Sequence, residues 1–111
     1  MSMMETKYDY LLNAQTRLRV AFKTGRGKVV QFVVQLELFQ EDAWKPIMRY
    51  DTGHGFAHRD RYLPDGAVSK HEQLPVSDLD EALTYAIHTM KRDWMELCQE
   101  FIARRAKPRR R

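Results

Sequence analysis

The sequence is poor in cysteine and has no long hydrophobic run. Its single cysteine, Cys98, cannot form an internal disulfide and excludes a zinc cluster built from cysteines. No apolar stretch approaches the ~20 residues that a membrane-spanning helix needs. Residues 1–15 also lack the continuous apolar core of a signal peptide. We therefore expect a cytoplasmic protein that does not contact a membrane.

Basic residues are concentrated at one end of the chain. The 111 residues carry a net charge of +4, and 43% of them are hydrophobic, which fits one domain with a modest core. Basic side chains fill most of the last eight positions: Arg104, Arg105, Lys107, Arg109, Arg110 and Arg111. The remaining chain holds fewer basic than acidic residues. We predict one domain over residues 1–103 and a basic tail over residues 104–111.

Apolar and polar residues alternate through the first half of the chain, which is typical of strands with one buried face. Glycine-containing or polar turns separate the alternating runs, so each strand connects to the next by a short link. This pattern predicts a four-stranded antiparallel meander. The strands are expected at residues 17–23, 29–39, 44–51 and 56–63. Residues 1–15 carry little pattern, and residues 67–76 are expected to form a loop or short extended segment.

One long amphipathic helix is predicted after Ser77, which is the expected N-cap because acidic residues follow it in the first turn. Apolar residues then recur every three or four positions: Leu79, Leu83, Ile87, Met90, Trp94, Leu97 and Phe101. The predicted fold is therefore α+β, with the C-terminal helix packed on one face of the sheet and the other face partly open. An uncovered face or edge would favour a homodimer.

Ionisable residues are densest between Arg49 and Tyr62, in the segment RYDTGHGFAHRDRY. The candidate site residues are Asp51, His54, His58 and Asp60, together with Arg49, Arg59 and Arg61. A glycine turn between antiparallel strands brings facing residues to ~5 Å at the β-carbon. We therefore expect one histidine and one aspartate to be neighbours across this hairpin, with an arginine close by.

Three interpretations of this segment remain open on residue chemistry alone. In the first, His54 and His58 act as base and acid in RNA cleavage by the 2′-hydroxyl, without a metal or other cofactor. Asp51 or Asp60 would orient one imidazole, and Arg49, Arg59 and Arg61 would bind phosphate. In the second, Asp51, His54, His58 and Asp60 bind a metal, although their spacing matches no standard zinc motif. In the third, the segment is a hydrogen-bonded turn with no chemistry.

The segment RYDTGHGFAHRD resembles the TumE family of small bacterial toxins and related short bacterial proteins. The matching residues are Arg49, Tyr50, Asp51, His54, Gly55, His58 and Arg59. Thr52 and Gly53 stand where asparagine and alanine are common, and Asp60 stands where a further histidine is common. The resemblance implies the toxin of a type II toxin–antitoxin pair, with a DNA-binding antitoxin as partner. RNA is the substrate that best fits the residues.

A second function of a different class uses the basic residues instead. Five cations lie in the hairpin Arg17–Lys28 with no acidic residue among them: Arg17, Arg19, Lys23, Arg26 and Lys28. Together with the tail, they predict a non-enzymatic module that binds nucleic acid or an acidic protein. Such binding would weaken strongly with salt.

Overall fold

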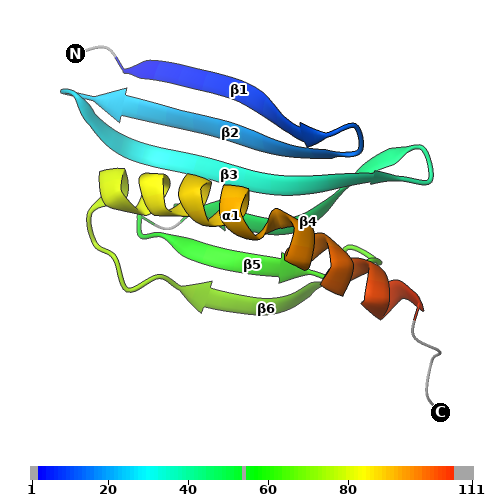
Figure 1. Ribbon diagram of the computed structural model, residues 1–111. Helices are drawn as coiled ribbons and strands as arrows, with labels where there is room; N and C mark the ends of the chain where they lie inside the picture. The colour runs from blue at the N-terminus through cyan, green and yellow to red at the C-terminus, as the bar shows by residue number, and fades with distance from the viewer. Residues whose placement is uncertain (1–2, 54, 107–111) are drawn as a thin grey trace.

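The computed structural model describes residues 3–53 and 55–106, which form one six-stranded antiparallel sheet and one long helix. The strands follow one another across the sheet in sequence order, and the helix lies across one face (Figure 1). The elements are β1 (Met4–Asn13), β2 (Thr16–Gly25), β3 (Lys28–Gln40), β4 (Ala43–Asp51), β5 (His58–Tyr62), β6 (Val68–Gln73) and α1 (Leu79–Ala106). The α+β class, the meander and the C-terminal helix on one face are confirmed.

The predicted number of four strands is wrong, because the two edge strands of the sheet lack the alternating pattern on which the prediction depends. Residues 4–13 form β1, which pairs with β2, and residues 68–73 form β6, which pairs with β5. Nearly every residue of both strands is exposed. An edge strand without a buried face has no need of the apolar alternation that reveals a strand in the sequence.

The core lies between α1 and the strands that it covers. Alternate residues of β2, β3 and β4 point toward the helix, and the register places Leu18 opposite Leu36 and Val34 opposite Tyr50. The helix contributes a stripe that includes Ala82, Ala86 and Met90. All of these side chains are buried, and Tyr50 is completely inaccessible. Burial of this apolar surface is the main force that holds helix to sheet.

The helix begins at Leu79, one residue later than predicted, and its N-cap is Asp78 rather than Ser77. Asp78 Oδ1 accepts hydrogen bonds from the backbone N–H groups of Asp80 at 2.8 Å and Glu81 at 3.3 Å. An aspartate in this position satisfies donors that lack partners within the helix. The other end of α1 extends through Ala106, so the predicted tail boundary after residue 103 lies inside the helix. Residues 107–111 of the tail lie outside the described residues.

The sheet face turned away from α1 is called the open face here. The register places one row of polar residues across this face, with one residue from each strand: Asp9, Arg19, Gln35, Arg49, Asp60 and His71. Two members of this row, Arg49 and Asp60, belong to the ionisable segment Arg49–Tyr62.

Within the described part of the chain, no helix is both long and apolar enough to span a bilayer.

Candidate functional site: a His–Asp cluster on the open face

The first part of the site is a histidine–aspartate pair between β4 and β5. Asp51 and His58 are register partners, and His58 Nε2 lies 2.5 Å from Asp51 Oδ1. Arg49 lies two residues before Asp51 on the same face, with its Nε 3.5 Å from Asp51 Oδ2. Only 6% of the His58 side chain is exposed. The expected neighbouring histidine, aspartate and arginine are therefore present in the structure.

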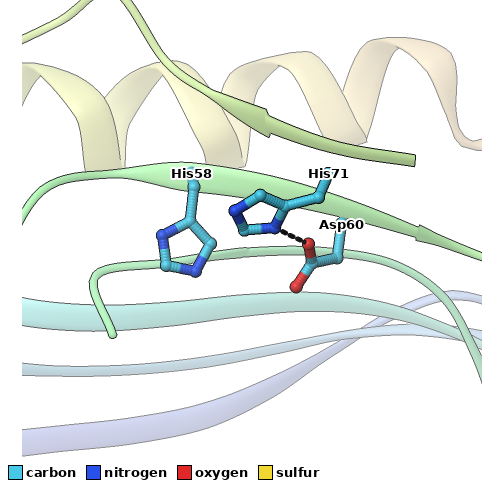
Figure 2. Close-up of side chains that lie close together, drawn as sticks. All are labelled: His58, Asp60 and His71. Carbon is cyan, nitrogen blue, oxygen red and sulfur yellow. Dashed lines mark hydrogen bonds and ion pairs between the residues drawn. The ribbon is translucent and has the colours of Figure 1, made fainter. Parts of the chain in front are cut away.

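A second histidine–aspartate pair lies beside the first, between β5 and β6. Asp60 and His71 are register partners, and His71 Nδ1 forms a hydrogen bond with Asp60 Oδ1. The ring centroids of His58 and His71 lie 4.9 Å apart. Figure 2 shows both imidazoles and the Asp60 carboxylate gathered on one side of the sheet. Asp51, His58, Asp60 and His71 are called the His–Asp cluster below.

The two imidazoles differ in their access to solvent. The His71 side chain is 57% exposed on the edge strand, whereas His58 lies under the β4–β5 turn. Gly53 of this turn is so close that a Cβ placed on it would lie 3.5 Å from His58 Cε1. The Gly53 N–H also donates to Asp51 Oδ1 at 3.1 Å, which fixes the carboxylate beneath the turn. The cluster thus combines one buried imidazole with one accessible imidazole.

Three members of the cluster are close enough to share a metal ion. One ligand atom each from His58, Asp60 and His71 lie within 4.8 Å of one another. Among the described residues this set differs from the alternative drawn from the sequence, because it includes His71 and omits Asp51, whereas His54 lies outside those residues. Asp51 lies instead against His58, where it can orient the ring.

Arg59 and Arg61 are not positioned to bind a phosphate at the cluster. Successive residues of a strand point to opposite faces, so both arginines lie on the helix-covered face while His58 and Asp60 lie on the open face. Arg59 donates to Glu72 through its Nε at 3.1 Å, and Arg61 Nη1 lies 3.4 Å from Glu100 Oε1. Of the three predicted phosphate-binding arginines, only Arg49 is at the cluster.

Two ionisable groups next to Arg59 on the helix-covered face have shifted pKa values. The hydrogen bond from Arg59 lowers the pKa of the Glu72 carboxyl. Burial raises the pKa of the nearby Tyr50 hydroxyl. Both effects stabilise the neutral Tyr50 and charged Glu72 that surround the Arg59 guanidinium. This group serves the packing of β5 and β6 rather than an open site.

Arg49 also borders two shallow hollows of the open face. One has a volume of about 210 Å³ and lies against Val33, Asp51 and Gly53. The other has a volume of about 280 Å³, and its polar lining includes Lys7, Arg19 and Gln35. Arg49 and the cluster residue Asp51 therefore both line a hollow of the open face.

The hairpin that the sequence presents as purely basic is partly neutralised in the fold. Arg17 Nε lies 2.6 Å from Glu37 Oε1 on β3, and Arg19 Nε lies 3.4 Å from Asp9 Oδ1 on β1. These carboxylates are distant in the sequence and are brought in by strand pairing. The hairpin therefore presents fewer uncompensated cations than its sequence indicates.

The remaining two histidines are placed differently from His58 and His71. His54, predicted to be catalytic, lies outside the described residues. His88 is exposed on α1. His71 was missed as a site residue because β6 was not recognised. The signal available for it was the turn Pro64–Gly66 followed by an extended segment, which is the arrangement of one further hairpin.

None of the curated proteins and none of the solved structures compared with the chain matches it. A family model described as a domain of unknown function, DUF7718, matches residues 3–107. This match spans all six strands and the whole helix. The chain therefore belongs to the DUF7718 family.

Proposed function

We propose that the protein is a toxin-like RNA-cleaving domain whose active site is the His–Asp cluster together with Arg49. One observation carries the proposal: two histidine–aspartate pairs lie side by side, with ring centroids 4.9 Å apart, next to an arginine on the uncovered sheet face. Acid–base cleavage of RNA needs two groups that exchange protons near neutrality and one cation for the phosphate. His58 and His71 supply the first two groups, and Arg49 supplies the cation.

His71 and His58 divide the proton transfers. His71 is the accessible imidazole, and it takes the proton of the 2′-hydroxyl as that oxygen attacks phosphorus. His58, whose Nδ1 is buried, gives its Nε2 proton to the departing 5′-oxygen, so the bond to that oxygen breaks as a 2′,3′-cyclic phosphate forms. The two histidines then exchange roles when water opens the cyclic phosphate, which returns both to their starting states.

The other members of the site hold these groups in place. Asp60 fixes the ring of His71 through Nδ1, and Asp51 fixes that of His58 through Nε2. Orientation by a carboxylate sets the tautomer and stabilises the imidazolium that forms during the reaction. The Arg49 guanidinium, whose side chain is 39% exposed, binds the phosphoryl oxygens as negative charge builds on them.

The biological context of the proposal comes from the resemblance of residues 49–60 to the TumE family. On this basis the domain acts in the cytoplasm of a bacterium and is held inactive by a neighbouring antitoxin. The ten-residue edge strand β1, which is exposed along almost its whole length, supports pairing with a second copy. No cofactor takes part in the proposed reaction.

A growth assay tests this function in cells. Induction of the wild-type chain should arrest bacterial growth, and His71→Ala should abolish the arrest while the chain remains folded and equally abundant. His88→Ala is the matched control, because this histidine is exposed on α1, and it should remain toxic. Full toxicity of His71→Ala, or no arrest by the wild type, would refute the proposal.

The non-enzymatic alternative predicts a different result. Salt-dependent binding of RNA without cleavage, lost on deletion of residues 104–111, would favour the interaction module. The pairing of Arg17 and Arg19 with acidic residues gives it less support than the cluster gives to catalysis.

A further inference from the structure

We propose that His58, Asp60 and His71 also form a binding site for a divalent transition-metal ion such as Zn²⁺, and that the bound ion inhibits RNA cleavage. The binding site stands on the ligand geometry alone, whereas the inhibition rests on the proposed function. The ion is thus a regulator of the site and not a participant in the reaction.

The three ligands have the chemistry and the placement that such ions require. Two imidazoles and one carboxylate form a donor set that zinc, cobalt and nickel readily accept. All three side chains come from the paired strands β5 and β6 and lie together on the open face (Figure 2). Strand pairing holds their backbones in fixed register, so little ordering is needed when an ion binds.

The spacing of the ligand atoms requires only a small adjustment. The atoms already lie within 4.8 Å of one another. Bonds of ~2.0–2.2 Å to a zinc ion would draw them together by a movement on the order of 1 Å. His71 can supply this movement, because its side chain is 57% exposed at the sheet edge.

The surrounding charges favour an ion at this place. Arg49 and Asp51 form an ion pair with Arg49 Nε 3.5 Å from the carboxylate, so the guanidinium charge is offset on the side of β4. Asp60 then supplies a carboxylate to the ion. Three protein ligands leave one coordination position of a tetrahedral ion for water or another small ligand.

Binding of the ion would oppose the proposed proton transfers. An imidazole nitrogen that donates its lone pair to a metal cannot accept a proton through the same lone pair. An ion held by His58 and His71 would therefore withdraw both proton carriers at once, and RNA cleavage should fall as the site fills.

Calorimetric titration of the untagged, chelator-dialysed chain with ZnCl₂ and CoCl₂ tests the binding site. We expect one ion per chain. Removal of a direct ligand in His71→Ala or Asp60→Asn should weaken binding by more than the ~10–100-fold typical of second-shell changes. His88→Ala should bind as the wild type does. No binding by the wild type, or equally tight binding by His71→Ala, would overturn the site.

RNA cleavage measured on the same samples separates the two proposals. Activity after chelation that falls on addition of Zn²⁺ supports both. Ion binding by a chain that never cleaves RNA supports the metal site and refutes the proposed function. Cleavage that increases with Zn²⁺ overturns the inhibitory role and the metal-independent reaction.

Discussion

The two faces of β5 and β6 present ionisable residues in opposite settings. On the helix-covered face, Arg59 pairs with Glu72 beside the buried Tyr50. In the next register pair of the same two strands, on the open face, Asp60 pairs with His71 beside His58. An arginine–carboxylate pair keeps both charges near neutral pH, whereas an imidazole ordinarily exchanges protons there. The difference indicates that the first pair stabilises the sheet and that the second can do chemistry.

The most direct test of the difference between the two faces removes one carboxylate from each of them. Asp60→Asn should lower the RNA cleavage rate by about 10²–10⁴-fold, because the His71 ring would lose the group that orients it. Glu72→Gln removes the carboxylate that pairs with Arg59 on the helix-covered face, and it should leave the cleavage rate unchanged. Single-turnover cleavage of a defined RNA measures both. Equal rates for the two variants would remove the distinction between the faces.

A second test compares the two faces of β3 in stability. Leu36→Ala, in the core beneath α1, should lower the free energy of unfolding by about 2–5 kcal/mol through lost burial and the cavity left behind. Val33→Ala, at a half-buried position of the open face, should cost clearly less. Urea denaturation gives both values. A larger loss at Val33 would mean that the open face is covered by something other than solvent.

The smallest expected effect concerns the dependence of stability on pH. The pKa of Glu72 is lowered in the folded state by Arg59, so its contribution is present above the unfolded pKa and is lost as the pH falls through the folded value. Between neutral and acidic pH, the wild type should therefore lose more thermal stability than Glu72→Gln. Melting temperatures over this range test the prediction, and parallel curves would refute it.

The sequence predicts the parts of this fold that burial constrains. β2, β3 and β4 each have one face against the core, so Leu18, Val34 and Met48 follow the alternation that identifies them. β1 and β6 bury almost nothing and carry no such pattern. The exact N-cap was also misplaced, because Ser77 and Asp78 are both capping residues and only tertiary structure selects between them.

The contrast between strands with a buried face and exposed edge strands also explains which contacts at the site are predicted from the sequence. A histidine–aspartate contact across this hairpin is predicted from the sequence, because a short glycine turn sets the register between adjacent strands, and Asp51 with His58 is the pair that forms. The pairing of Asp60 with His71 depends on β6, which the sequence does not reveal. Arg59 and Arg61 lie next to site residues in the sequence, but strand alternation sends them to the other face. Proximity along the chain therefore overstated the number of arginines at the site.

A double-mutant cycle on RNA cleavage tests the central claim, that His58 and His71 act as one catalytic unit. Single-turnover rates would be measured for the wild type, His58→Ala, His71→Ala and the double variant, with His88→Ala as control and circular dichroism to confirm folding. We predict that each single variant loses nearly as much activity as the double variant, since residues that act together are strongly non-additive. Losses that simply multiply, or a His71→Ala variant as active as the wild type, would contradict the claim.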